Sequence, residues 1–327
     1  MGFLLNTRVG QLIVAVVLFA AVVAALLLIA KAADGVRERV RRPAMVAIFA
    51  GPALLLLALG LIYPFFRTVW MSFMDARSQS YVGFANYVDA LTVPSNLIGF
   101  RNTFLWVILT PLLSTGIGLV YAVLIDKSRF EKVAKAMLFL PMAISFVGAG
   151  IIWKFVYEYK GAGQQQIGAL NAVIDALGLE PVRFLQDAPA NTIFLILVLV
   201  WIEAGFAMVI LSASIKAVPE DIIEAARLDG ASPWQLFWRI TIPSIRPSLV
   251  VVLTTISIAT LKIFDITRTM TGAKFDTQVL ANLMYDQSFT FGNNGLGSAM
   301  AVFIFLLVVP LVIFNIRQMA KNREVRG

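Results

Sequence analysis

Three ionisable side chains lie within or beside long apolar segments, where a charge is costly and is a functional candidate by default. Glu203 occupies the stretch Leu-Val-Trp-Ile-Glu-Ala-Gly-Phe, and Lys262 and Asp265 share the stretch Thr-Leu-Lys-Ile-Phe-Asp. All three could contact a solute inside a membrane. Alternatively, Glu203 and Lys262 could pair across a helix interface, and Lys262 and Asp265 could pair locally at the i, i+3 spacing. The sequence leaves these alternatives open.

Enzymatic chemistry has little support elsewhere in the chain. It contains no His and no Cys, which removes the commonest general base, the thiolate nucleophile and the usual ligands of zinc. The phosphate-binding loop, the G-x-S-x-G serine motif and the H-E-x-x-H zinc motif are also absent from the sequence. We therefore predict no catalytic residue, no metal site, no cofactor and no ATP hydrolysis in this chain.

The composition is that of a membrane protein. Of the 327 residues, 59% are hydrophobic and 14% are charged, whereas soluble domains carry about 25% charged residues. A backbone in lipid must satisfy its own hydrogen bonds, so apolar runs of spanning length are expected to be helices. We predict an all-α integral membrane protein with about seven transmembrane helices, at residues 11–30, 44–66, 102–125, 136–156, 192–215, 248–267 and 298–316.

The net charge of +8 is explained by topology. Lys and Arg gather in alternate connections, with 17 in one set and 8 in the other. The positive-inside rule makes the richer set cytoplasmic; it comprises residues 31–43, 126–135, 216–247 and 317–327. This places the C-terminus in the cytoplasm and argues against nucleic acid as a partner. The first apolar run could be a signal peptide, but it is long and is followed by basic residues, so we predict an extra span with an external N-terminus.

The polar segment between the fifth and sixth predicted spans has strong helix-boundary signals. Pro219 suits a first helical position and is followed by two acidic residues that favour a helix N-terminus. Gly230 suits the residue that ends a helix, and Ser232 with a Pro after it and a Gln at the third position suits the start of another. Pro243 and Pro247 are expected to stop this second helix before the next span. The segment is predicted to be a pair of short helices joined by a tight turn on the cytoplasmic face.

This segment resembles the EAA signature of bacterial ABC importer permeases. The matching positions extend over twenty residues and include Phe237 and Ile240, and those that the resemblance assigns to contact with an ATPase are Glu224, Ala225, Ala226, Asp229, Gly230, Ala231 and Pro243. In that family the segment is a coupling helix pair that inserts into a separate cytoplasmic ATPase subunit.

Two further matches narrow the resemblance to sugar-importer permeases of the maltose-transporter type. One is Val-Gly-Phe-Ala-Asn-Tyr at 82–87, followed by Asn102-Thr103, and the other is Ile-Phe-Asp at 263–265, with Thr271-Gly272 and residues 285–289 beyond it. The stretch Thr-Gly-Ala-Lys-Phe from Thr271 departs from the Thr-x-Gly-Gly-Pro usual there. The likeness covers about residues 44–320 and implies a six-helix permease core of type I with one additional N-terminal helix.

The resemblance also implies the partners and the cargo. A second homologous permease forms a heterodimer with this chain, two ATPase copies bind ATP and Mg below it, and an extracytoplasmic binding protein delivers a sugar. An α-glucoside such as maltose or trehalose is favoured. Planar and aromatic groups suit sugar hydroxyls and C–H faces, and in the family the contacts come from the spans that carry the candidate residues Trp201, Glu203, Phe206, Thr260, Lys262, Phe264 and Asp265.

These features predict three parts: an extra span with a basic linker at 1–43, a permease core at 44–316 with coupling helices at 219–243, and a basic cytoplasmic tail at 317–327. The protein is expected in the bacterial inner membrane. Two alternatives remain: an ion-coupled secondary transporter, which should show an inverted repeat that we do not find, and an ABC importer of a non-sugar solute.

Overall fold

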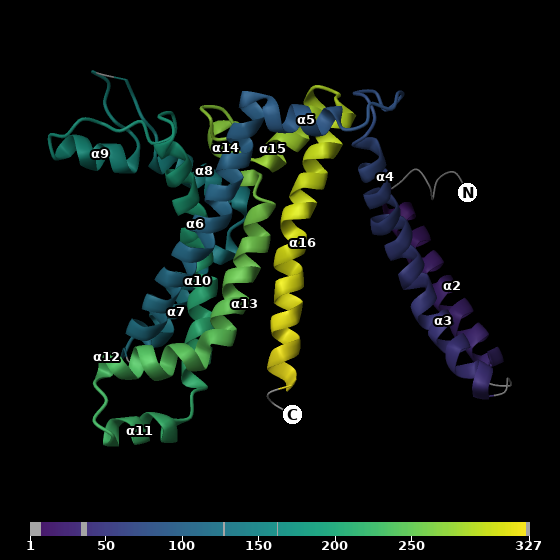
Figure 1. Ribbon diagram of the computed structural model, residues 1–327, viewed down its shortest axis with the longest axis horizontal. Helices are drawn as coiled ribbons and strands as arrows, with labels where there is room; N and C mark the ends of the chain where they lie inside the picture. The colour runs from purple at the N-terminus through teal and green to yellow at the C-terminus, as the bar shows by residue number, and fades with distance from the viewer. Residues whose placement is uncertain (1–7, 34–37, 127, 162, 325–327) are drawn as a thin grey trace. The chain divides into compact units, whose positions relative to one another are not determined.

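The computed structural model describes residues 8–33, 38–126, 128–161 and 163–324. Within these ranges the regular structure is helical, apart from an isolated antiparallel bridge between Met74 and Tyr81. The chain divides into two compact units, residues 1–68 and 69–327 (Figure 1). The predicted all-α class is confirmed.

The first unit contains the two N-terminal predicted spans. Helix α2 runs over Arg8–Ala33 and contacts α3, which runs over Glu38–Leu57. A π-helical turn, η1 at Ala58–Ile62, joins α3 to α4 at Tyr63–Met71. Together they form an apolar helix, Met45–Met71, long enough to cross a membrane. Its large apolar side chains are mostly exposed, which is how a lipid-facing helix is expected to look.

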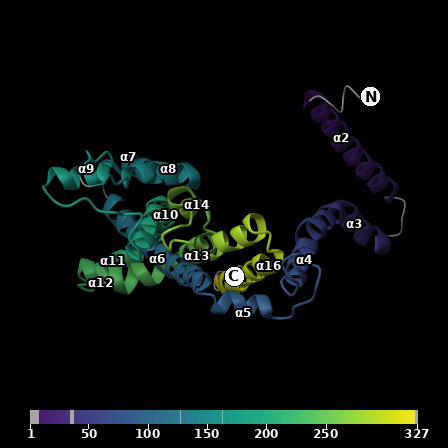
Figure 2. The same ribbon diagram turned by 90° about the horizontal axis from the view of Figure 1, so that it is seen from above.

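The second unit is built around two long helices. Helix α10 (Ala190–Lys216) packs along α6 (Pro94–Ile125), and Figure 2 shows this pair in the middle of the unit. The two helices can approach closely at Gly118 because glycine has no Cβ. A Cβ there would clash, since it would lie 2.5 Å from the Ala207 Cβ atom and 2.7 Å from the Met208 nitrogen. Small residues serve helix packing in membranes in this way. Gly116, two residues earlier on the same helix, has no neighbouring atom within 4 Å of its Cβ position and serves no such contact among the described residues.

The fourth predicted span, 136–156, is not one continuous helix. Helix α7 (Glu131–Phe139) and a 3₁₀ turn, η2 (Leu140–Ala143), are followed by α8 (Phe146–Val156) after a bend of 102°. Pro141 lies in the bend, as expected of a residue that cannot continue the backbone ladder. Ser145 then starts α8 by accepting a hydrogen bond from the Gly148 nitrogen at 3.1 Å.

The sixth predicted span, 248–267, has the wrong bounds. The observed helix begins much earlier, at α12 (Pro233–Leu236), and continues through a π-helical turn, η3 (Phe237–Thr241), into α13 (Ile242–Leu261). Neither Pro243 nor Pro247 stops it. In the π turn the Ile242 nitrogen bonds to the Phe237 oxygen, one residue further back than in an α-helix; this widening accommodates the proline that follows. The helix ends at Leu261.

Short helices close the end of the second unit opposite α11 and α12 (Figure 1). Helices α14 (Asp265–Thr271) and α15 (Leu280–Tyr285) lie there with a π turn, η4 (Asp286–Thr290), and with α5 (Ala85–Thr92). The last helix, α16 (Asn294–Glu324), packs against α13 and α15. A short helix, α9 (Ala169–Ala176), lies in the connection between α8 and α10.

Buried asparagines fix the loop between α14 and α15. Asn102 donates to the Asp276 and Gln278 carbonyl oxygens at 2.6 and 2.9 Å, and Asn191 donates to the Phe275 oxygen at 2.7 Å. Both asparagines are fully buried. The loop needs such support because Ala273, Phe275 and Asp276 all have φ between 56° and 59°, a left-handed conformation that is unfavourable for side chains with a Cβ.

The structure confirms the helical class but not the predicted number of membrane spans. In the described part of the chain, five helices are long and apolar enough to cross a membrane, and the bent pair α7–α8 makes up to six. Helix α2 adds a further apolar helix that covers the first predicted span. The total of seven stays a prediction.

Candidate coupling surface and solute-binding residues

The predicted helix pair is present at one end of the second unit. Helix α11 covers Glu220–Leu228, with Pro219 one position before the helix rather than inside it. Its C-terminus closes through hydrogen bonds from the Gly230 nitrogen to the Arg227 oxygen and from the Ala231 nitrogen to the Ala226 oxygen, both 3.0 Å. Gly230 has φ +82° and open space around its Cβ position. Glycine is therefore required by backbone conformation and not by crowding.

The second helix starts as predicted. Ser232 accepts a hydrogen bond from the Gln235 nitrogen at 3.3 Å, and the Gln235 side chain accepts one from the Ser232 nitrogen at 2.9 Å, which completes a capping box. The predicted stop before the next span is wrong, because α12 continues into α13. As a result, the hairpin is joined to a membrane helix on both sides. Helix α12 continues into α13 without a break, and three residues connect α10 to α11.

The hairpin presents large apolar side chains to its surroundings. Leu228 is 89% exposed and Trp234 is 71% exposed, and the Trp234 and Trp238 rings pack edge to face with centroids 5.5 Å apart. An exposed Trp is typical of a protein-binding surface, and the neighbouring exposed Leu extends the apolar area of the hairpin. The sequence prediction concentrated on the EAA residues and missed these side chains, although the i, i+4 spacing of the two tryptophans places them on one helix face.

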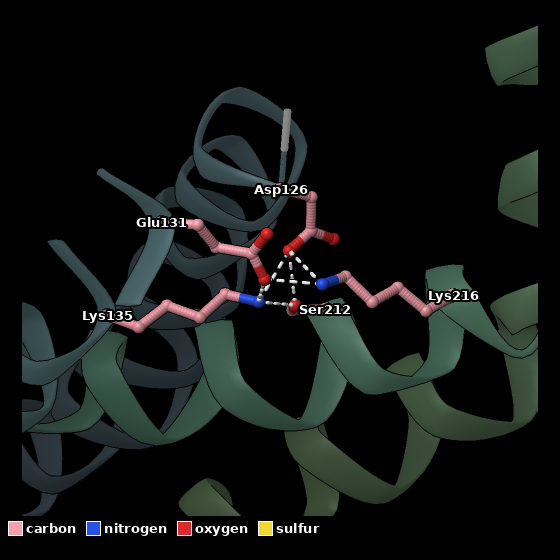
Figure 3. A network of polar contacts seen from close by, with 5 residues as sticks. All are labelled: Asp126, Glu131, Lys135, Ser212 and Lys216. Carbon is pink, nitrogen blue, oxygen red and sulfur yellow. Dashed lines mark hydrogen bonds and ion pairs between the residues drawn. The ribbon is translucent and has the colours of Figure 1, made fainter. Parts of the chain in front are cut away.

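A network of charged side chains lies where α6, α7 and α10 meet (Figure 3). Lys135 contacts Asp126 at 2.5 Å and Glu131 at 2.9 Å. Ser212 donates to Asp126 at 2.6 Å and also contacts Lys135, and Lys216 contacts Glu131 and lies 3.8 Å from Asp126. The network ties the last turn of α10, directly before the hairpin, to the turn between α6 and α7.

This network was not predicted. The sequence analysis used the basic residues of 126–135 only to assign the membrane topology. The one local sign of the network is the i, i+4 spacing of Glu131 and Lys135, which is the favourable order for a helical ion pair. Ser212 and Lys216 come from a segment far along the chain. The Asp126 carboxylate is only 10% exposed, so its contacts are shielded from solvent better than those of a surface pair.

The predicted solute-binding residues on α10 lie close to the broken span. Trp201 is half-buried, packs edge to face on Trp153 with ring centroids 5.6 Å apart, and lines a cavity of about 220 Å³ beside Pro141. Phe206 packs against the core between α6, α10 and α13. Glu203 is half-buried, and within the described residues its carboxylate has no ion-pair or hydrogen-bond partner.

The remaining solute-binding candidates lie at the break after α13. The Thr260 hydroxyl donates to the Ile256 oxygen of its own helix at 2.7 Å and is fully buried. Lys262 is exposed and, with Phe264, lines a cavity of about 320 Å³ that differs from the one beside Trp201. Asp265 occupies the first turn of α14. The described residues show no ion pair between Glu203 and Lys262 or between Lys262 and Asp265; the break in the helix leaves the lysine outside the packed interface.

The described residues form a bundle of apolar helices that carries a capped, exposed hairpin, as expected of a multi-pass membrane protein with a docking surface. The chain belongs to the family described as the binding-protein-dependent transport system inner membrane component, which matches residues 114–326. The fold agrees: a chain of a crystallised bacterial alginate ABC transporter superposes with a TM-score of 0.73 at 21% identity, covering 85% of this chain and 94% of that one.

Two curated relatives match most of the chain. The osmoprotective compounds uptake permease protein GgtC of Synechocystis sp. is 50% identical over 279 residues, which are 85% of this chain and all of the relative. The α-glucoside transport system permease protein AglF of Rhizobium meliloti is 47% identical over 276 residues, which are 84% of this chain and 82% of the relative. The chain is thus a permease subunit of an ABC importer, and the predicted family is confirmed.

Proposed function

We propose that this importer carries a neutral sugar or oligosaccharide, with an α-glucoside such as maltose or trehalose favoured. The observation that carries the proposal is the 47% identity to an α-glucoside permease over most of both chains. The candidate solute-binding residues include three ionisable groups among aromatic and hydroxyl side chains. A charged cargo calls for more counter-charges inside the membrane, so this composition supports a neutral one.

A second candidate cargo is an osmoprotective compound, favoured by the 50% identity to a permease of that description. The two proposals name the same class of solute if the osmoprotectant is itself a glycoside. They name different classes if the osmoprotectant has no sugar ring.

ATP hydrolysis belongs to a separate subunit in this proposal. Two ATPase copies bind ATP and Mg, and each permease of a heterodimer inserts its hairpin into one of them. The exposed Leu228 and Trp234 side chains supply apolar contact at the hairpin, with the EAA residues Glu224, Ala225 and Ala226 on α11 beside them. An external binding protein delivers the solute to the opposite end of the permease pair.

The transport cycle follows from population shift. Closure of the ATPase dimer carries the hairpin with it, and this biases the permease toward the state that receives the solute from the external side. The hairpin transmits such a displacement well because its second helix continues directly into α13 and because the ion network ties the end of α10 to α6 and α7. Hydrolysis then restores the resting state. In this arrangement the C-terminus is cytoplasmic and the N-terminus external.

The proposal is tested by reconstituting the transporter, purified with its partner subunits, into liposomes that contain ATP. Uptake of labelled maltose, trehalose and glycine betaine is then compared. Sugar uptake that requires ATP and the binding protein is the expected result. Uptake of the betaine alone would favour the second candidate cargo, and uptake without ATP would favour an ion-coupled carrier.

The Glu203→Gln variant tests the solute-binding assignment on α10. Since Glu203 has no ion-pair partner among the described residues, the neutral isostere should leave assembly intact while lowering sugar uptake by about tenfold, the effect of one lost charged hydrogen bond. Glu180→Gln, at an exposed position beyond α9, is the control and should not change uptake. Loss of the assembled complex in Glu203→Gln would show that this residue holds the structure instead.

A further inference from the structure

A shallow cavity of about 670 Å³ lies beside the ion network. Its lining comes from the turn between α6 and α7, from the first residues of α7 and from the end of α10. The side chains that matter here are Arg129, Phe130, Glu131, Lys132, Val133 and Lys216. The cavity therefore adjoins the hairpin but belongs to neither the hairpin surface nor the solute-binding candidates.

The charges around this cavity do not cancel. Lys216 is neutralised in part by Glu131, which also contacts Lys135. Arg129 and Lys132 are both exposed, and neither has a carboxylate partner among the residues that the structure describes. Two uncompensated cations and a shared lysine thus surround one carboxylate. A ligand that fits this cavity carries negative charge, and a guanidinium beside an ammonium group suits a phosphate in particular.

An apolar strip leads away from the cavity along α7. Phe130, Val133, Met137 and Leu140 recur at helical spacing on one face of the helix and its flanks, and they are 72, 54, 69 and 66% exposed. Phe130 and Val133 also line the cavity. The strip therefore begins where the cations end, and it continues into the part of α7 that is expected in the membrane.

We propose that this cavity binds the phosphate of an anionic phospholipid, with the acyl chains along the exposed face of α7. Basic pockets beside membrane helices bind anionic headgroups, and a helix face of exposed apolar side chains suits the acyl chains of the same molecule. A free phosphate would neutralise the cations but would leave the exposed apolar strip on α7 uncovered. The phospholipid accounts for both observations.

The bound lipid has a consequence for the ion network. Lys216 serves both the cavity and the network, because it contacts Glu131 and Asp126 and also lines the cavity. A lipid phosphate competes with these carboxylates for its ammonium group. The anionic lipid content of the membrane therefore acts on the junction that precedes the hairpin, whichever solute the transporter carries.

The experiment uses the assembled transporter in nanodiscs of phosphatidylcholine with or without phosphatidylglycerol. Native mass spectrometry counts the phosphatidylglycerol molecules that the complex retains after ejection from the nanodisc. The Arg129→Gln/Lys132→Gln variant should weaken this retention by about fivefold for each cation removed. The matched control is Arg246→Gln/Arg317→Gln, which removes two exposed cations from α13 and α16, outside the cavity.

The proposal is supported if retention falls in the first variant, is unchanged in the control and withstands excess inorganic phosphate. It is overturned if both variants lose phosphatidylglycerol to the same extent, because the lipid is then held by general surface charge. It is also overturned if the first variant retains the lipid as the parent does, because the cavity cations then do not hold it. Displacement of the lipid by inorganic phosphate also overturns it, since the cavity would then bind free phosphate. Size-exclusion chromatography of each variant confirms that the complex is assembled, and sugar uptake is scored separately.

Discussion

The two ends of the second unit are held together by different chemistry. At the hairpin end, partly exposed charged groups join α6, α7 and α10, with exposed fractions from 10% for Asp126 to 49% for Lys216. At the opposite end, neutral side chains such as Asn102 and Asn191 hold the loop between α14 and α15 by hydrogen bonds and are fully buried.

This difference suits different tasks. Breaking a buried amide contact leaves polar groups without water or partner, so such contacts favour one rigid arrangement. In the ion network Glu131 and Lys216 are 28 and 49% exposed, so water compensates in part for a contact that they lose and they can exchange partners at lower cost. The hairpin end is thus built to change, and the opposite end is built to keep its shape.

The largest effect on stability is expected at the end opposite the hairpin, where the buried asparagines hold the loop between α14 and α15. Asn102→Leu removes both donors to the Asp276 and Gln278 oxygens, and each partly buried carbonyl left without its donor costs up to about 1–3 kcal/mol. The midpoint of thermal unfolding of the purified complex should fall clearly, and proteolysis of the loop should accelerate. Gln278→Leu, which removes one exposed bond to the Ser95 oxygen at 3.3 Å, is the control and should have a small effect. Equal effects would remove the contrast between the ends.

A smaller loss is expected at the ion network. Asp126→Asn removes the charge that faces Lys135 and Lys216, but Glu131 still contacts both lysines and both are partly exposed, so the cost should be about 1–2 kcal/mol. The same thermal measurement checks it, with Asp175→Asn on exposed α9 as a control for charge removal. If Asp126→Asn matches Asn102→Leu in cost, the network is a rigid anchor and not an adaptable junction.

Gly230→Val should destabilise the protein no more than Asp126→Asn does, but it should impair transport strongly. A β-branched residue at φ +82° is strained by about 1–2 kcal/mol, and the turn can relax because open space surrounds it. Relaxation changes the angle between α11 and α12, so ATP hydrolysis should continue with little sugar uptake. Gly161→Val, also in open space but with an ordinary φ, is the control. Normal coupled uptake in Gly230→Val contradicts the role of the hairpin as a lever.

The smallest effect is expected for a solvent-exposed ion pair at the end opposite the hairpin. Lys160 contacts Glu158 at 3.1 Å with both side chains about one third exposed. Lys160→Gln should therefore change stability by less than about 1 kcal/mol. A larger shift in thermal midpoint than that of Asp126→Asn would show that solvent exposure is not what separates the two kinds of contact.

Much of the hairpin was predictable because its signals are local. The Ser232 capping box and the left-handed Gly230 involve residues within a few positions of each other, so the sequence displays them directly. The predicted stop at Pro243 failed for a physical reason that no local rule contains. The π turn before it widens the helix, and packing of α13 against α6 and α16 keeps the helix continuous.

The solute-binding assignments were predictable only as a set of residue types. Costly polar groups in apolar segments identify Glu203 and Lys262, but the sequence does not say which of them face one another. In the structure Trp201 and Lys262 line different cavities, because α13 ends at Leu261 and redirects the chain.

By itself, the sequence determined the membrane class, the helical architecture and the capped hairpin. These depend on hydrophobic run length and on contacts between near neighbours, both of which can be read along the chain. Only the tertiary structure decided the ion network, the loop held by buried asparagines and the cavity beside the ion network. Ser212 lies 86 residues from Asp126, and Asn102 lies 174 from Asp276. Such pairs meet only after the helices pack, because packing, not local preference, chooses which distant polar groups satisfy each other.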